Sequence, residues 1–296
     1  MEENKVTSRE ELKSYFEAGD YPTQAQFGKL IDSLRHKEDV FTNKEAAILA
    51  NSLAAIENGY IQYHATDVSN RKFSLVVSQQ NEEDQLIEIG ETNGISVRKY
   101  FYGNAPYTVK AKNFPAEGLK EYEYYFLQYQ IDPGYYSYKL FGNNLPTIDE
   151  GFEFGTLKGK MFYLQLQKNN IGQKVDIVNT RISFKNNTDI TILYRTEAGN
   201  WSDRYQSGDS VTDHYDVWDY VSVHYNADLR GIDQSIECKI YNADNEQLLQ
   251  TGYLYSGQNN ESAWGGQVIK VRNVRIECNY TSLPPQNSNI SSPLEE

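Results

Sequence analysis

The stretch YIQYHATDVSNRKFSLVVSQQNEEDQLIEI, residues 60–89, decides the fold class of this chain. Apolar and polar side chains alternate along its three hydrophobic segments, and a period of two residues is typical of β-strands that bury one face. The polar sequences SNR (69–71) and NEED (81–84) lie between the segments and favour turns. The stretch therefore predicts three short strands joined by tight turns.

The alternation continues to residue 113, with the group TNG as a further turn. We expect five strands in this part, at 60–66, 72–79, 85–90, 95–102 and 107–113. Strands at this spacing predict a small sheet or barrel-like module over residues 59–113. The segment NFPAEG, residues 113–118, is a plausible domain boundary because proline and glycine interrupt both helices and strands.

Longer alternating runs follow this boundary, without a helical period. They predict about nine strands, at 121–130, 135–141, 160–168, 175–185, 189–196, 211–225, 234–242, 246–255 and 267–280. The loops are rich in glycine and asparagine, which favours a β-sandwich of jelly-roll type over residues 114–281. Tyrosine (24 residues) outnumbers phenylalanine (12), and a ring with a polar tip suits antiparallel sheets with one wet face.

The segment SREELKSYFEAGDYPTQAQFGKLIDSLRHKED, residues 8–39, has a helical period instead. Ser8 with Glu11, and Thr23 with Gln26, have the spacing of capping boxes, and they predict a helix of about three turns and a second helix over 24–37. The apolar residues of the two helices can close as an αα-hairpin: Leu12, Tyr15, Phe16, Phe27, Leu30, Ile31 and Leu34. A unit this small cannot fold by core burial alone, so we expect it to attach to a partner surface.

A third helix is expected over residues 44–57. Its apolar residues Ala46, Leu49, Leu53 and Ile56 are spaced 3, 4, 3, which is an a/d seam of two heptads. Two readings stay open: an amphipathic helix that lies on its own domain, and an oligomer seam that leads into the β modules. The copy number is not specified by two heptads.

These patterns divide the chain into four parts. Residues 1–58 form a helical attachment and oligomerisation segment, 59–113 a small β module, and 114–281 a β-sandwich. The last segment, 282–296, contains three prolines and no apolar period, so we expect an extended or disordered tail. The predicted fold class is thus mainly β with an α-helical N-terminus.

Charge and hydropathy exclude several function classes. The net charge is −13 and the pI is about 4.9, so the surface repels nucleic acid and anionic lipid. Neither a signal peptide nor an apolar run of about 18 residues is present, so no membrane insertion is expected. Cys238 and Cys278 both lie in predicted strands, which favours two core thiols over a disulfide or redox pair.

Catalytic and metal-binding patterns are weak. The four histidines are His36, His64, His214 and His224, and none has the spacing of a metal site. The stretch SVTDHYDVWDY, residues 210–220, fits the wet face of one long strand better than an acid/base or calcium site. No G-x-S-x-G, P-loop or dinucleotide motif is present. We therefore expect neither catalysis nor a metal or other cofactor.

The three tryptophans differ in their surroundings. Trp201 and Trp264 are flanked by glycine, asparagine and serine, which is typical of loops. An exposed ring there could contact a glycan, or it could pack down over the end of the sandwich, and the second reading is the commoner case. Trp218 lies in a predicted strand and is expected in the core.

The segment from residue 8 to 39 also resembles virion and tail-type proteins of phages that infect Bacteroidetes, including crAss-like phages. The shared pattern is Leu-Lys-x-Tyr-Phe, then Gly-Asp-x-Pro-Thr-x-x-Gln-Phe, Leu-Ile-Asp-Ser and a His-Lys-acidic end. In this chain these groups span residues 12–16, 19–27, 30–33 and 36–39. The resemblance covers about 30 of the 296 residues. It implies a virion appendage subunit whose helices anchor or trimerise while the β part projects.

The combined prediction is a non-enzymatic structural protein of a bacteriophage virion, assembled in the host cytoplasm. It would be a fibre or tail-appendage subunit, a homotrimer that binds other virion proteins through residues 1–58 and contacts a host surface glycan. The alternatives are a carbohydrate-binding module of non-viral origin and, less favoured, a glycan-degrading enzyme.

Overall fold

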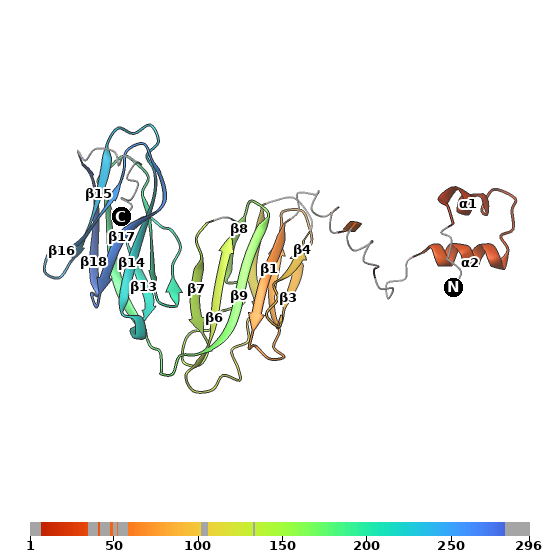
Figure 1. Ribbon diagram of the computed structural model, residues 1–296, viewed down its shortest axis with the longest axis horizontal. Coiled ribbons are helices and arrows are strands. Elements are labelled where there is room, and N and C mark those ends of the chain that lie inside the picture. The colour runs from red at the N-terminus through yellow and green to blue at the C-terminus, as the bar shows by residue number, and fades with distance from the viewer. Residues whose placement is uncertain are drawn as a thin grey trace, which may run out of the picture. The chain divides into compact units, whose positions relative to one another are not determined.

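The computed structural model describes residues 7–34, 41, 48–49, 52, 59–101, 106–132 and 134–281. It divides into two compact units, Met1–Ile56 and Glu57–Glu296 (Figure 1). Among the elements with described bounds, two short helices lie in the first unit and the strands lie in the second. The chain is therefore mainly β with helices near the N-terminus, as the sequence predicts.

The helical unit contains α1 (Arg9–Ser14) and α2 (Gln24–Ser33), each with the predicted N-cap. The Ser8 hydroxyl accepts a hydrogen bond from the backbone N–H of Glu11, and Thr23 and Gln26 form the full capping box. Both caps satisfy N–H groups that a helix start leaves unpaired. α1 is shorter than the three turns expected, because the chain already turns before Gly19, whose φ is 100°.

Few apolar side chains are covered within this hairpin. The Phe16 and Phe27 rings make an edge-to-face contact at 5.8 Å, and Lys29 Nζ lies 3.0 Å from a carboxylate oxygen of Glu11. Tyr15 is buried, whereas large parts of the Phe27 and Ile31 side chains stay exposed. Among residues 7–34 the apolar stripe of α2 thus has no complete cover.

Residues 60–170 form a first β-sandwich. Its strands are β1 (Tyr60–Thr66), β2 (Phe73–Ser78), β3 (Gln85–Ile89), β4 (Val97–Tyr100), β5 (Tyr107–Asn113), β6 (Glu123–Ile131), β7 (Ser137–Phe141), β8 (Glu153–Leu157) and β9 (Met161–Asn170). One sheet has the order β4-β1-β9-β6-β7 and the other the order β3-β2-β5-β8. β1 and β9 are parallel and the other pairs are antiparallel.

Residues 177–281 form a second β-sandwich. Its strands are β10 (Ile177–Asn186), β11 (Leu193–Ala198), β12 (Trp201–Ser202), β13 (Ser210–Tyr215), β14 (Tyr220–Asp228), β15 (Ser235–Asn242), β16 (Gln247–Leu254), β17 (Asn259–Ile269) and β18 (Asn273–Thr281). The sheet orders are β13-β10-β18-β15-β16 and β12-β11-β14-β17. The parallel pair is β10 with β18.

The two sandwiches have the same topology. Adding nine to each strand number of the first sandwich reproduces both sheet orders of the second, including the parallel pairing of first and last strand. The probability that two unrelated nine-strand orders agree in every neighbour is small. The second unit is therefore a tandem of one architecture, with a short connection over residues 171–176 between the copies.

This arrangement corrects the predicted boundary after residue 113. β5 ends there, but it pairs with β8, and β1 pairs with β9. Residues from both sides of the boundary also share one core, which runs from Ile61 to Leu166. The jelly-roll order is wrong as well, because a jelly roll has antiparallel neighbours and each sandwich here closes with a parallel pair.

Several strands differ from their predicted bounds. The run 211–225 is interrupted by a 3₁₀ turn at Asp216–Trp218, so it forms β13 and β14. The run 267–280 contains the end of β17 and β18 up to its last residue but one. β8 and β12 were not predicted, because each is short and lies among turn-forming residues.

Cys238 and Cys278 are buried free thiols that lie opposite each other on β15 and β18, as expected for core residues. The contact with the neighbouring Cys278 thiol, together with burial, raises the pKa of Cys238 far above its usual range.

The predicted third helix, 44–57, mostly falls outside the described residues. Ala46, Leu53 and Ile56 of the predicted seam are not among them, and Leu49 is a helical residue with 46% of its surface exposed. The predicted tail 282–296 also lies outside the described part of the chain.

Candidate functional site

The two sandwiches meet in a small third core. It contains Tyr124, Leu140, Leu145, Val175, Ala198, Trp201 and Tyr215, drawn from both sandwiches and their connection. The Tyr215 hydroxyl lies 2.7 Å from the backbone N of Leu140 and 3.1 Å from its carbonyl oxygen. Burial raises the pKa of Tyr215 far above its usual value, so the hydroxyl stays protonated.

Two further hydrogen bonds fix the junction. The backbone N–H of Val175 donates to the Tyr124 hydroxyl at 2.9 Å, and that of Tyr138 donates to the Ser202 hydroxyl at 2.9 Å. The second contact joins β7 to β12 directly. Polar side chains of each sandwich thus satisfy backbone groups next to the apolar contact.

A cleft of about 860 Å³ opens beside this junction; we call it the junction cleft. It is lined by Gly134, Tyr135, Tyr136 and Tyr138 of the first sandwich and by Arg195, Glu197, Tyr205, Asn226, Asn259, Glu261 and Ser262 of the second. The first group comes from the β6–β7 hairpin, and the second from the outer face of the sheet β12-β11-β14-β17 and the segment after β12. Its size is within the usual range for small-molecule sites, which often lie between domains.

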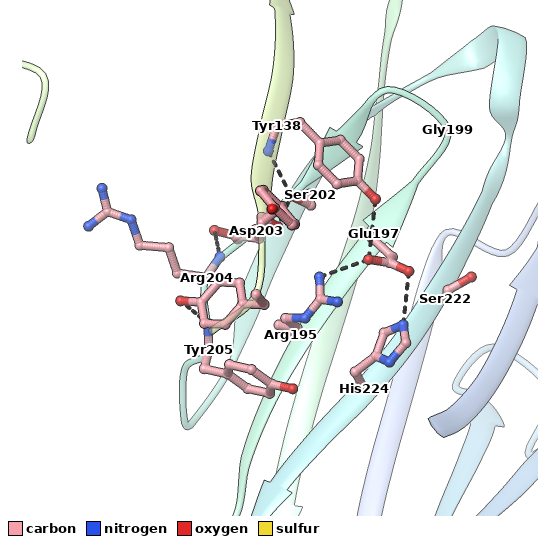
Figure 2. A network of polar contacts seen from close by, with 12 residues as sticks. Tyr138, Arg195, Glu197, Gly199, Ser202, Asp203, Arg204, Tyr205, Ser222 and His224 are labelled. Carbon is pink, nitrogen blue, oxygen red and sulfur yellow. Dashed lines mark hydrogen bonds and ion pairs between the residues drawn. The ribbon is translucent and has the colours of Figure 1, made fainter. Parts of the chain in front are cut away.

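A carboxylate at the floor of the cleft joins both sandwiches. Glu197 accepts a hydrogen bond from the Tyr138 hydroxyl at 3.2 Å, contacts His224 Nε2 at 2.9 Å and pairs with Arg195 Nη1 at 2.8 Å. Figure 2 shows Arg195, Glu197 and His224 side by side on the sheet, with Tyr138 approaching from β7. We call these four residues the Glu197 cluster.

The cluster perturbs the ionisation of its members. The hydrogen bond from His224 is the largest cause that lowers the pKa of Glu197, to about 2, and Arg195 lowers it further. Burial and the Glu197 charge raise the pKa of Tyr138 to about 12. Glu197 is therefore ionised at neutral pH, and its contact with His224 requires the hydrogen on Nε2 of that ring.

Arg195 is held by rings as well as by Glu197. Its guanidinium carbon lies 5.2 Å from the ring centroid of Tyr135 and 5.8 Å from that of Tyr205. The two rings meet edge to face at 4.8 Å, so they form one aromatic surface around the cation. Arg195 is 7% exposed, and among the described residues its Nε has no hydrogen-bond partner.

The predicted glycan contacts, Trp201 and Trp264, lie in strands and not in loops. Trp201 starts β12, is 8% exposed and belongs to the junction core, which fits the alternative that it packs down. Trp264 lies on β17, is 56% exposed and meets His224 edge to face at 5.3 Å. The structure thus separates the two rings: one supports the junction, and one stands exposed beside the Glu197 cluster.

Trp218 is half-buried and not in a strand. It lies in the 3₁₀ turn after β13 and covers Gly199, where an added Cβ would come within 2.4 Å of its ring. Gly199 has a φ of 48° and makes the turn between β11 and β12. This turn pairs Glu197 with Ser202 and Ala198 with Trp201 across β11 and β12.

His214 and the nearby acids have structural partners. His214 is buried, and its Nε2 lies 3.4 Å from Asp219, which also pairs with Arg272 at 2.6 Å. Within the described ranges, no group of three or more His, Cys, Asp and Glu residues could hold a metal ion. None of the helices in this part of the chain is long and apolar enough to cross a membrane.

Sequence reasoning missed Arg195, Glu197 and His224 as a site. The available signal was an arginine at the end of the predicted strand 189–196 with a glutamate two residues later, just beyond that strand, together with the run YYSY after the turn that precedes β7. Each residue by itself fits the wet face of a strand.

No family model matches the chain, and no curated protein matches it. Among solved structures, the chain has a similarity to the major pilin protein T-13 of Streptococcus pyogenes, at 8% identity. The match has a TM-score of 0.17 and covers 76% of this chain and 98% of the pilin chain. A TM-score this low does not establish a common fold.

Trp201 is buried and Trp264 is mostly exposed, so removing each indole should affect the stability of the fold differently. Trp201→Ala should lower the free energy of unfolding by about 3–5 kcal/mol, because it empties a buried site in the junction core. Trp264→Ala should change it by less than about 1 kcal/mol, since the ring is mostly in solvent. Denaturant unfolding followed by circular dichroism measures both. Equal losses would contradict these positions.

The lowered pKa of Glu197 predicts an acid-dependent stability. A carboxyl with a folded pKa of about 2 and an ordinary value of 4.5 stabilises the fold above pH 4.5, and this contribution is lost as the pH falls toward 2. Glu197→Gln should therefore be less stable at neutral pH and depend less on pH between these values.

Unfolding curves at a series of pH values give this dependence. Glu88→Gln, which removes an exposed carboxylate from β3 in the first sandwich, is the control. A Glu197→Gln variant with the slope of the unmodified protein would show that the cluster does not contribute to acid stability.

Proposed function

We propose that this chain is a non-enzymatic structural subunit of a bacteriophage virion appendage, a fibre or tail-type protein. Residues 1–58 attach it to other virion proteins, and the two β-sandwiches project from that base. The protein is assembled in the host cytoplasm and resides in the virion. The resemblance of residues 8–39 to virion proteins of Bacteroidetes phages supports this proposal together with the features below.

The exposed apolar stripe of α2 is the observation that carries the proposal. Phe27, Ile31 and Leu34 are 46%, 65% and 64% exposed, although a helix of this kind normally buries that stripe. Both helices are nevertheless well capped, so the hairpin is specified by its sequence. A capped hairpin with an uncovered apolar stripe fits an attachment segment that completes its core on another protein.

The β part and the charge agree with this role. Two sandwiches of the same strand order in tandem fit a structural role, which does not require catalytic residues. The net charge of −13 disfavours nucleic acid and anionic membranes as partners. Other virion proteins, further copies of this chain and a host surface glycan are therefore the partners we propose.

The proposed assembly is a homotrimer that forms through Ala46, Leu49, Leu53 and Ile56. The heptad spacing of these residues supports a helical seam, and the half-exposed Leu49 side chain fits a contact with another copy. The number three comes from the resemblance to virion appendages.

The attachment proposal predicts that charge on the α2 stripe blocks incorporation. A full-length protein with Phe27→Asp and Ile31→Asp should keep its β circular dichroism but be absent from purified particles, because two carboxylates prevent apolar docking. Ala25→Asp is the control, since it places the same group on the opposite side of α2. Normal incorporation of the double variant would contradict the attachment role.

The proposed trimer predicts that charges in the helical seam abolish oligomerisation. Leu49→Asp combined with Leu53→Asp should convert the protein to a monomer, because each copy would bring two charges into the seam. Asn51→Asp, at a heptad position away from the seam, should leave the mass unchanged. Multi-angle light scattering at micromolar concentration measures the mass, and a monomeric unmodified protein would exclude the trimer.

A further inference from the structure

The junction cleft has a defined shape before any ligand binds. The backbone carbonyl of Tyr136 accepts a hydrogen bond from Ser202 at 3.3 Å, and its ring meets the Tyr163 ring edge to face at 5.9 Å. Tyr136 is nevertheless 42% exposed. A large ring that is held through its backbone and by one ring contact, yet open on much of its surface, is a preformed binding surface.

The polar groups on the opposite wall are also oriented. Asn226 Nδ2 donates to the carbonyl oxygen of Glu261 at 3.0 Å, and Asn259 Nδ2 donates to the Glu261 carboxylate at 3.3 Å. Each amide has two N–H donors and a carbonyl acceptor, so these contacts leave hydrogen-bonding capacity on both side chains. The wall can therefore both donate and accept hydrogen bonds at fixed positions.

Charge in the cleft disfavours ionic ligands. The positive charge of Arg195 is balanced by Glu197, and Glu261 adds an exposed carboxylate, so an anion gains little there. A cation would compete for the faces of Tyr135 and Tyr205, which already contact the Arg195 guanidinium. A neutral ligand with apolar faces and many hydroxyl groups matches the remaining surface.

We propose that the junction cleft binds a neutral oligosaccharide. The Tyr136 ring packs against the C–H face of a sugar, and Asn226, Asn259 and Glu261 bond to its hydroxyl groups. Arg195 lies at the floor of this site. Its buried Nε has no hydrogen-bond partner among the described residues. Trp264, which contacts the Glu197 cluster through His224, extends the surface for a longer chain.

The test uses the full chain and defined probes. Oligosaccharides built from glucose, mannose, galactose or N-acetylglucosamine are titrated by calorimetry, beside galacturonate-containing oligosaccharides and choline. We expect binding of at least one neutral probe, with an affinity that does not change as added salt shortens the screening length from about 10 Å at 0.1 M to about 3 Å at 1 M. Binding of the acidic probes or choline alone, or of no probe, would overturn the proposal.

Two variants locate the site. Tyr136→Ala should weaken binding about tenfold or more, and Glu261→Gln should weaken it several-fold while preserving the shape of the wall. Tyr100→Ala is the matched control, because it removes a ring of similar exposure, 39%, from β4. Equal effects of Tyr136→Ala and Tyr100→Ala would place the ligand elsewhere, and melting curves verify that each variant is folded.

This inference does not depend on the appendage proposal. Particle incorporation depends on α2, and oligosaccharide binding depends on the junction cleft. A chain that binds a neutral probe but never enters particles would remove the proposed function and leave the cleft assignment. A chain that enters particles but binds no probe would remove the cleft assignment and leave the proposed function.

Discussion

The docking of one sandwich on the other depends on tyrosine hydroxyls that bond to backbone groups across the junction. Tyr215 reaches both backbone groups of Leu140, and Tyr124 accepts from Val175. An apolar contact alone tolerates sliding, but a buried N–H that loses its partner costs about 1–3 kcal/mol. These hydrogen bonds therefore select one docking geometry, and the walls of the junction cleft have a fixed spacing because of it.

The duplicated topology shows which part of the molecule is specialised. β7 and β12 meet at the junction, and their counterparts in the strand order are β16 and β3. β3 has five residues and an exposed Leu86, whereas β12 has two residues and starts with the buried Trp201. The sheets and their closing parallel pairs are thus common to both copies, and the edges differ. The junction cleft opens beside those edges, and it is lined by the β6–β7 hairpin of the first sandwich and by β11, β14, β17 and the segment after β12 of the second.

Local pattern predicted most of the strands, because alternation of buried and exposed residues is a property of each segment. β1 and β5 have the predicted bounds. Strand pairing is not local: β1 pairs with β9 about 100 residues later, so the boundary after residue 113 was wrong. The site was missed for the same reason. Arg195, Glu197 and His224 each alternate with core residues, and their strands must be paired before a common cluster is visible.

The Glu197 cluster connects docking with recognition. Glu197 accepts a hydrogen bond from Tyr138 of the first sandwich and contacts Arg195 and His224 of the second. One carboxylate therefore contributes both to the junction and to the floor of the cleft. A ligand that contacts both walls binds the docked arrangement and not a separated one. Ligand binding then stabilises the docked arrangement by RT ln(1 + [L]/Kd). Fixed docking preorganises the cleft, and an occupied cleft reinforces the docking.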